Sequence, residues 1–203
     1  MSAARSPLSV EESSLIRRAK GGDERAFSEL VTRYEGPVYN FAFKVCRDRE
    51  KAGETLQDTF LTVYRKLAQF DGRSAFTTWL YRIVANHCKM KHRRRKLDTL
   101  MESLDEPPIA HDHRDDERER EFAAPEEDTP IEKLLTRELQ RVLDQAIQKL
   151  PLDYRTVFVL RDVEGLSTKE TAGVVKISEE AVKSRLRRAR AFLRREIAPY
   201  MGW

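Results

Sequence analysis

Apolar residues recur every three or four positions along most of this chain, and the strict alternation typical of strands is nearly absent. The pattern therefore predicts an all-α protein. In the first part of the chain it predicts helices over residues 10–20, 24–45, 49–68 and 79–96, with an interruption or kink at Gly36-Pro37 and a loop at residues 70–76. In the second part it predicts helices over residues 134–150, 152–164, 168–175 and 179–197.

Capping residues mark several of these helix ends. Ser9 with Glu12, and Ser167 with Glu170, have the spacing of capping boxes, in which each side chain satisfies the other residue's backbone amide. Asp23 is placed to cap the helix that follows it. The caps fall where the apolar period begins, so two independent signals indicate the same helix starts.

Charge divides the chain into three segments. Residues 1–97 hold 20 Lys and Arg against 11 Asp and Glu, a net charge of +9. Residues 98–130 hold 3 against 13, or −10, and residues 131–203 hold 15 against 10, or +5. The acidic segment also contains four prolines, so we expect two small helical domains, at 1–97 and 131–203, joined by an acidic flexible linker at 98–130. Basic ends favour a polyanionic partner, although charge runs are often only solvated surface.

The cysteine count and hydropathy bear on the compartment. The two cysteines, Cys46 and Cys88, are too few for a disulfide framework, which favours a reducing interior. No stretch of about 18 apolar residues and no apolar signal core is present, so we expect an intracellular protein without membrane insertion.

Cys88 and His92 have the i, i+4 spacing of a metal pair, but zinc normally takes three or four ligands. We therefore predict no metal and no cofactor.

The predicted helix at residues 49–68 has two distinct faces. One is an apolar stripe that we expect in the core, made of Ala52, Leu56, Phe60, Val63 and Leu67. The other sets a leucine among polar residues, namely Glu54, Gln57, Asp58, Leu61 and Arg65. An apolar anchor inside a polar rim is typical of protein interfaces, although single exposed leucines are also ordinary.

Aromatic residues precede a strongly basic run in the next segment. Six of the eight residues at 89–96 are Lys or Arg, and Phe70, Phe76 and Trp79 lie just upstream. A basic groove beside aromatic rings suits single-stranded DNA, because unstacked bases can stack on the rings. The alternative is that the three aromatics belong to the core.

The end of the chain has the dimensions of a helix-turn-helix, with a short helix, a tight turn at residues 176–178 and a long basic helix. The last helix has an apolar face formed by Val182, Leu186, Ala189, Leu193 and Ile197. Another face carries Lys183, Arg187, Arg190 and Arg194. Residues near the start of a recognition helix enter the major groove, so the best candidates for base contacts are Lys183, Ser184, Arg185 and Arg188. The alternative is a surface helix that is basic by chance.

Several motifs stand in a fixed order along the chain. They are Gly22-Asp23 with Ala26-Phe27 and Leu30, Gln57-Asp58-Thr59-Phe60, the run from Phe76 through Ile83 with Asn86, Leu150-Pro151 with Arg155, Glu164-Gly165-Leu166-Ser167, and Val182-Lys183-Ser184-Arg185-Leu186 with Arg188-Ala189-Arg190. In this order and at these separations they resemble bacterial RNA polymerase sigma factors of the extracytoplasmic-function (ECF) group of the sigma-70 family. The resemblance covers nearly the whole chain.

The resemblance implies three binding surfaces. The first would bind core RNA polymerase at its β′ coiled-coil, alongside a second contact at the β flap, through Glu54, Gln57, Asp58, Phe60 and Leu61. The second would capture the −10 promoter element as single-stranded DNA, with Asn86 lining a pocket for a flipped base, through Phe70, Arg73, Ser74, Ala75, Phe76, Trp79, Arg82, Asn86, Lys89 and Arg93. The third would read the −35 element as duplex through Glu180, Lys183, Ser184, Arg185, Arg187 and Arg188.

The resemblance has further implications for the molecule as a whole. It implies a cytoplasmic factor for a stress or envelope response that needs no cofactor and is not an enzyme. It also implies that the acidic linker threads through polymerase and that an anti-sigma factor masks the polymerase-binding surfaces. Two departures from the family pattern are Gly53, in a usually acidic and leucine-rich segment, and Glu179-Glu180 in place of a common Gly-Thr pair.

Two other functions are compatible with parts of the sequence. A helix-turn-helix regulator that is not a polymerase subunit would account for residues 131–203 but would leave the first domain without a role. An enzyme with a metal bound at Cys88 and His92 would need further ligands that no motif supplies.

Overall fold

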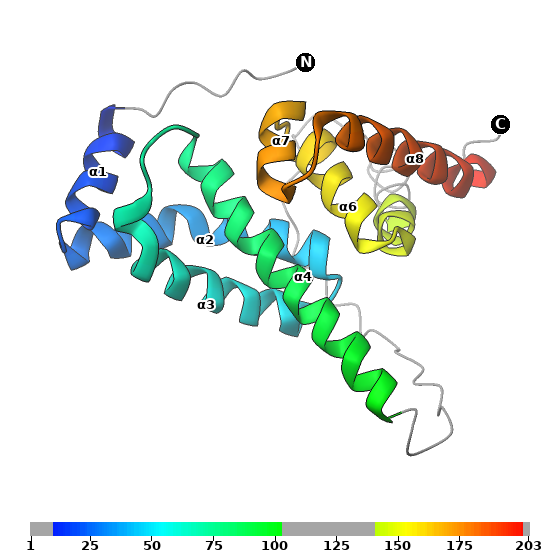
Figure 1. Ribbon diagram of the computed structural model, residues 1–203, viewed down its shortest axis with the longest axis horizontal. Helices are drawn as coiled ribbons and strands as arrows, with labels where there is room; N and C mark the ends of the chain where they lie inside the picture. The colour runs from blue at the N-terminus through cyan, green and yellow to red at the C-terminus, as the bar shows by residue number, and fades with distance from the viewer. Residues whose placement is uncertain (1–9, 103–140, 201–203) are drawn as a thin grey trace, which may run out of the picture.

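The regular structure of the protein is helical wherever it is described (Figure 1). The computed structural model describes residues 10–102 and 141–200. We refer to these two parts as the first half and the second half. The predicted all-α fold with two helical units is confirmed. None of the helices in the described part of the chain is long and apolar enough to span a bilayer.

The first half is a bundle in which α2 packs against α1, α3 and α4 (Figure 1). Its helices are α1 (Val10–Lys20), α2 (Glu24–Cys46), α3 (Arg49–Lys66) with a 3-10 turn at Leu67–Gln69, and α4 (Phe76–Glu102). Because α3 also contacts α4, three long helices enclose one apolar core.

The second half is a smaller group of helices with α6 packed on α8. Residues 141–149 are helical. The remaining elements are α6 (Leu152–Phe158), a π-helical turn (Val159–Val163), α7 (Thr168–Val175), α8 (Glu179–Ile197) and a 3-10 turn (Ala198–Tyr200). The helix predicted at residues 152–164 therefore changes from α- to π-helical geometry at Val159.

Side-chain caps begin several helices, and those at Asp23 and Ser167 were predicted. The Ala26 N–H donates to Asp23 Oδ1 at 3.0 Å, which starts α2. Ser167 and Glu170 form the reciprocal capping box of α7, and Ser178 caps α8 by accepting from the Ala181 N–H. The capping box predicted at Ser9 lies outside the described residues.

Two predicted boundaries differ from the structure. Helix α2 runs through Pro37 without ending, so of the predicted interruption or kink at Gly36-Pro37 the interruption is not observed. Helix α4 continues to Glu102, past residue 98 where the linker was predicted to begin. The rest of the predicted linker and the apolar residues predicted at 134–139 lie outside the described residues.

The buried face of α3 is rotated from the predicted apolar stripe. Thr55 and Thr59 are fully buried, whereas Leu56 and Phe60 are only partly buried. The actual stripe is Ala52, Thr55, Thr59 and Val63, which also has helical spacing. Because α3 is packed between α2 and α4, the smaller threonine side chains face the closely packed helices and the larger apolar residues lie at the margins.

The two halves pack directly against each other, and most of their buried apolar side chains form one continuous cluster. Val157, Val182 and Leu186 form a smaller cluster in the second half. Helix α7 lies against α4, and α6 and the π-helical turn lie against α2 (Figure 1). At this contact the Tyr81 hydroxyl of α4 donates a hydrogen bond to the Glu164 carboxylate.

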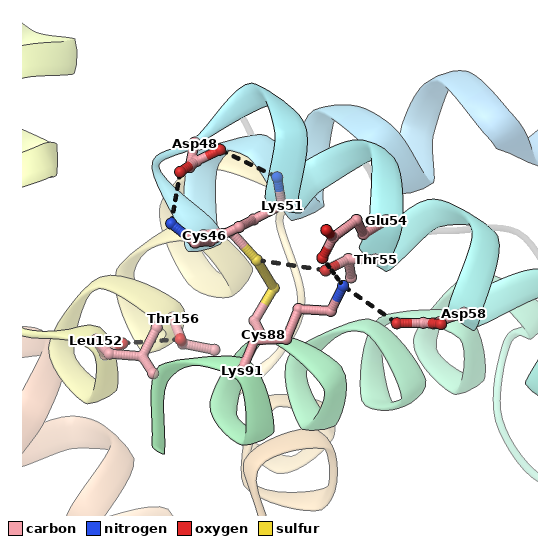
Figure 2. Close-up of a disulfide and its surroundings, with 10 residues drawn as sticks. All are labelled: Cys46, Asp48, Lys51, Glu54, Thr55, Asp58, Cys88, Lys91, Leu152 and Thr156. Atoms are coloured by element: carbon pink, nitrogen blue, oxygen red, sulfur yellow. Dashed lines mark hydrogen bonds and ion pairs between the residues drawn. A yellow bond between two sulfur atoms is a disulfide. The ribbon is translucent and has the colours of Figure 1, made fainter. Parts of the chain in front are cut away.

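Cys46 and Cys88 are joined in a disulfide, with their Cα atoms 5.6 Å apart. The cysteine count excludes a framework of several disulfides but not this single bond. The bond links the last residue of α2 to the middle of α4 (Figure 2). These positions are 42 residues apart in sequence, so only the packing of α4 across α2 brings the sulfur atoms together.

Candidate nucleic-acid and polymerase interfaces

Helix α8 presents a basic surface above a buried apolar face. Val182, Leu186, Ala189 and Leu193 are buried as predicted. The preceding turn is formed by Lys176, whose left-handed backbone (φ 55) ends α7, and by the Ser178 cap. These local features hold α8 at a fixed angle to α7, which is the arrangement of a helix-turn-helix.

The residues predicted to contact the −35 element differ in exposure. Glu180, Lys183, Arg187 and Arg188 are exposed, and Ser184 and Arg185 are partly buried. Arg185 lies 3.4 Å from the Asp153 carboxylate, and Arg188 donates to the Tyr154 hydroxyl at 3.3 Å. Both arginines therefore interact with α6 in this structure.

Two further charged groups on α8 are fixed by hydrogen bonds. Arg190, which the pattern placed on the basic face, donates to both Asp162 oxygens at 2.8 and 2.6 Å. This carboxylate raises the pKa of Arg190. The pKa of Glu180 is lowered by hydrogen bonds from its own backbone N–H and from the Ser178 hydroxyl, so its charge is stabilised at the start of α8.

The loop before α4 closes over an aromatic cluster. Phe70 and Phe76 are only 3% and 1% exposed. Their rings meet edge to face, and the partly buried Trp79 stacks on Phe76 at a centroid distance of 5.6 Å. In this structure Phe70 and Phe76 are therefore buried rather than open platforms for bases, in line with the alternative that placed the aromatics in the core. The two rings are part of the core and support Trp79.

Beyond this cluster, α4 carries the remaining residues predicted to contact the −10 element. Asn86, Lys89 and Arg93 are exposed, as is Arg73 in the loop, whose side chain pairs with Asp71 at 2.5 Å. Ser74, Ala75 and Arg82 are partly buried. The Asn86, Lys89 and Arg93 positions recur at three and four residues, so they lie along one face of α4.

Arg82 lies at the contact between the two halves rather than on an open surface. A Cβ at Gly173 of α7 would come within 3.7 Å of the Arg82 guanidinium. The Arg82 Nε is buried and has no hydrogen-bond partner among the described residues. The second half therefore covers part of the surface predicted to bind the −10 element.

The exposed face of α3 holds the residues predicted to bind polymerase. Glu54, Gln57 and Leu61 are exposed, and Asp58 and Phe60 are partly buried. The Lys91 ammonium of α4 lies 2.5 Å from Glu54 and 3.2 Å from Asp58 (Figure 2). The two carboxylates of α3 are thus paired to the basic segment of α4.

Two family models match this chain, one in each half. The family model for Sigma-70 region 2 matches residues 30–97, and the model for Sigma-70, region 4 matches residues 140–193. The chain is 32% identical over 197 residues to the ECF RNA polymerase sigma-E factor of Haemophilus influenzae, covering 95% of this chain and 98% of the relative.

This chain belongs to the ECF group of the sigma-70 family.

Other relatives are sigma factors as well. The chain is 32% identical to the RNA polymerase sigma-H factor of Pseudomonas aeruginosa over 94% of this chain and 96% of the relative. Its fold is similar, with a TM-score of 0.64, to the sigma factor RpoE of Bartonella quintana, solved in complex with the anti-sigma factor NepR. That match covers 85% of this chain and 96% of the other at 19% identity. The protein is an RNA polymerase sigma factor, a transcription initiation factor with core polymerase and promoter DNA as its partners.

Sequence reasoning missed one exposed aromatic residue of this sigma factor. Tyr64 is 65% exposed beside Leu61, which is 55% exposed, and its ring meets the Phe27 ring edge to face at 5.2 Å. Tyr64 follows Leu61 by three residues on α3, and this spacing was the signal that could have identified it.

The metal pair considered at Cys88 and His92 shares its cysteine with the disulfide of this structure. The Cys88 sulfur is bonded to Cys46. Across residues 10–102 and 141–200, no group of three or more His, Cys, Asp or Glu side chains is placed to hold a metal ion.

Proposed function

We propose that this sigma factor uses three surfaces in initiation, with the exposed faces of α3, α4 and α8 binding core polymerase, the separated −10 strand and the −35 duplex, respectively. The observation that carries the proposal is the two-faced geometry of α4 and α8. Each helix is fixed by buried apolar residues and exposes basic or amide side chains on its other side. Lys and Arg suit phosphate and guanine edges, and Asn suits an adenine edge.

The residues assigned to each surface follow from exposure and from the family motif. For polymerase, at the β′ coiled-coil, they are Glu54, Gln57, Asp58, Leu61 and the newly found Tyr64. For the −10 strand they are Arg73, Trp79, Asn86, Lys89 and Arg93, with Arg82 joining when the halves separate. For the −35 duplex they are Lys183, Arg187 and Arg188, with Arg185 released from Asp153.

Initiation requires the two halves to separate. The −10 and −35 elements are about 25 base pairs apart, which is about 85 Å of B-form DNA. In this structure Tyr81 of α4 is hydrogen-bonded to Glu164, which lies just before the helix-turn-helix. The two DNA-binding elements are therefore in contact with each other. Such a closed chain cannot reach both elements, and binding to polymerase would hold the halves apart.

The proposed mechanism uses binding energy and no covalent chemistry by this chain. Contacts at −35 and with polymerase anchor the complex on duplex DNA. Contacts between α4 and extruded −10 bases then offset the few kcal/mol needed to unstack each base. Polymerase carries out RNA synthesis in the cytoplasm. We further propose an anti-sigma partner, supported by the relative solved with NepR.

The proposal is tested by transcription with purified core polymerase and full-length chain. We expect promoter-specific transcripts from genomic DNA that core polymerase alone does not make. Asn86→Ala should reduce permanganate reactivity of −10 thymines while leaving binding to duplex DNA intact. Asn40→Ala, which changes the same residue type on a partly buried position of α2, serves as the control. If core polymerase gains no start site from the protein, the proposal is wrong.

A further inference from the structure

The disulfide between Cys46 and Cys88 lies where the first half meets the second. Cys46 ends α2, Cys88 lies in α4, and Leu152 and Arg155 of α6 line the same small cavity of about 50 Å³. The neighbouring residues Val45 and Val84 are fully buried. The packed core around both positions therefore holds the two cysteines within bonding distance.

The compartment proposed for this protein makes a permanent disulfide unexpected. A sigma factor acts with core polymerase, and thiol-reducing systems keep most cytosolic cysteines reduced. Disulfides that do occur there are usually transient and redox-sensing. The function already proposed thus favours a bond that forms and breaks.

The surroundings of the pair suit thiol–disulfide exchange. Cys46 is partly exposed, whereas Cys88 is only 2% exposed, so an incoming reagent meets Cys46 first. The cavity beside them is lined by Val45, Cys46, Lys51, Cys88, Lys91, His92, Leu152 and Arg155. This lining includes three cationic side chains, of which Lys51 is paired with Asp48 and Lys91 with Glu54 and Asp58. Nearby cations stabilise the thiolate that attacks in exchange. Thr55 Oγ1 lies 3.7 Å from Cys46 Sγ and can hydrogen-bond to it.

We propose that Cys46 and Cys88 form a reversible redox site that responds to low-molecular-weight disulfides such as oxidised glutathione. The Cys46 thiolate attacks one sulfur of glutathione disulfide, which breaks that bond and releases one glutathione thiolate. The Cys88 thiol then loses its proton to solvent and attacks the Cys46 sulfur, releasing the second glutathione. Two protein thiols are oxidised to one disulfide, and one glutathione disulfide is reduced to two thiols.

The redox state of this site controls how firmly α4 is attached to the bundle. Cys88 is the last buried residue of α4 among those whose side chains are described, and Lys89, Met90, His92, Arg93 and Arg94 after it are exposed. Beyond the disulfide, the contacts that hold this segment to α3 include the ion pairs of Lys91. The oxidised bond therefore fixes the start of the segment of α4 that carries Lys89 and Arg93, and reduction leaves this segment less constrained.

The redox chemistry is tested on the full-length protein without reference to transcription. Protein is equilibrated with mixtures of reduced and oxidised glutathione, quenched with acid, alkylated with iodoacetamide and weighed intact. We expect one transition between a doubly alkylated and an unalkylated monomer. Cys46→Ser should show no such transition, and Thr55→Val, which keeps both cysteines, should shift its midpoint.

Thermal unfolding gives a second readout, in which the oxidised and reduced forms of the same protein are compared. The oxidised protein should unfold about 10 °C or more above the reduced protein, because the bond closes a long loop in the unfolded chain. The proposal is overturned if the cysteines stay reduced or stay bonded across the whole glutathione series. It is also overturned if a glutathione adduct persists at Cys46, or if non-reducing gels show that the bond joins two chains.

The effect on α4 rests on the function proposed above, so it is measured separately. Permanganate reactivity of −10 thymines with core polymerase should fall severalfold when the wild-type protein is reduced, and should not respond to glutathione in Cys46→Ser. Equal reactivity in both states would overturn the link between the disulfide and α4. Absence of transcripts in either state would instead count against the proposed function, while the thiol measurements would still decide the redox site.

Discussion

His87 is a titratable residue held between two helices. Its Nε2 lies 3.1 Å from Thr62 Oγ1, which joins α4 to α3. Burial lowers the pKa of His87 below its ordinary value of 6.5; the Asp58 carboxylate opposes the shift, and Lys91 and Lys66 add to it. The folded protein therefore favours the neutral ring.

This lowered pKa predicts a dependence of stability on pH. Below about pH 6.5 the unfolded chain binds a proton at His87 that the folded chain does not, so the free energy of unfolding should fall as the pH falls from 7 toward the folded pKa. His87→Gln should remove this part of the slope while keeping a hydrogen-bonding side chain. Urea unfolding at pH 5 to 7 measures both proteins, and parallel slopes would contradict the prediction.

Substitutions of single residues on α8 should distinguish specific contacts to DNA bases from the non-specific attraction of a basic helix to DNA. Lys183 is exposed near the start of α8, whereas Arg194 is exposed near its end. Lys183→Ala should weaken discrimination at one −35 position by about 1–3 kcal/mol, because a base contact is lost. Arg194→Ala should lower affinity evenly across sequences or not at all. Binding to a panel of single-base −35 variants at fixed salt distinguishes these outcomes.

At the scale of helices, sequence reasoning succeeded where local chemistry decides. The starts of α2, α7 and α8 were predictable because Asp23, Ser167 and Ser178 bond backbone amides only three residues away. The buried face of α3 was not predictable, because Thr55 and Thr59 are buried by the close approach of two other helices. The same limit hid the pairing of Cys46 with Cys88, which depends on how α4 crosses α2.

Gly53 provides a test of how strongly the stability of α3 depends on the helix propensity of its own residues. It lies inside α3, and a Cβ placed there would meet no atom within 4 Å. Gly53→Ala should therefore raise the free energy of unfolding by about 0.5–1 kcal/mol, since alanine restricts the unfolded backbone at no steric cost. Denaturant unfolding measures the change. A loss of stability would mean that the backbone at Gly53 is constrained in a way the contacts do not indicate.

At the scale of the whole molecule, charge alone would not have predicted contact between the halves. The segments at residues 1–97 and 131–203 both carry net positive charge, +9 and +5. The contact forms because the local surfaces are complementary, with apolar side chains in one cluster and Tyr81 hydrogen-bonded to Glu164. Motifs and helical spacing were enough to predict the three binding surfaces. They could not predict that α7 partly covers Arg82, because that covering depends on the contact between the halves.

The hydrogen bond between the halves is open to direct test. Tyr81→Phe keeps the buried ring but removes the donor to Glu164, and a hydrogen bond to a charged group contributes about 1.5–3 kcal/mol. The ratio of open to closed molecules should then rise by about tenfold or more. Small-angle X-ray scattering should show a larger radius of gyration. Tyr200→Phe, at a residue that is 66% exposed, is the matched control, and equal radii for the two variants would contradict the prediction.

The bridge from Lys91 to Glu54 and Asp58 joins two surfaces that would otherwise act separately. Any partner that draws these carboxylates to itself leaves an ammonium group without its counterions on the neighbouring helix. That ammonium would then be available to a phosphate. Binding of a partner protein to α3 should therefore strengthen the binding of DNA by α4. Binding of DNA should strengthen the binding of that partner by the same factor.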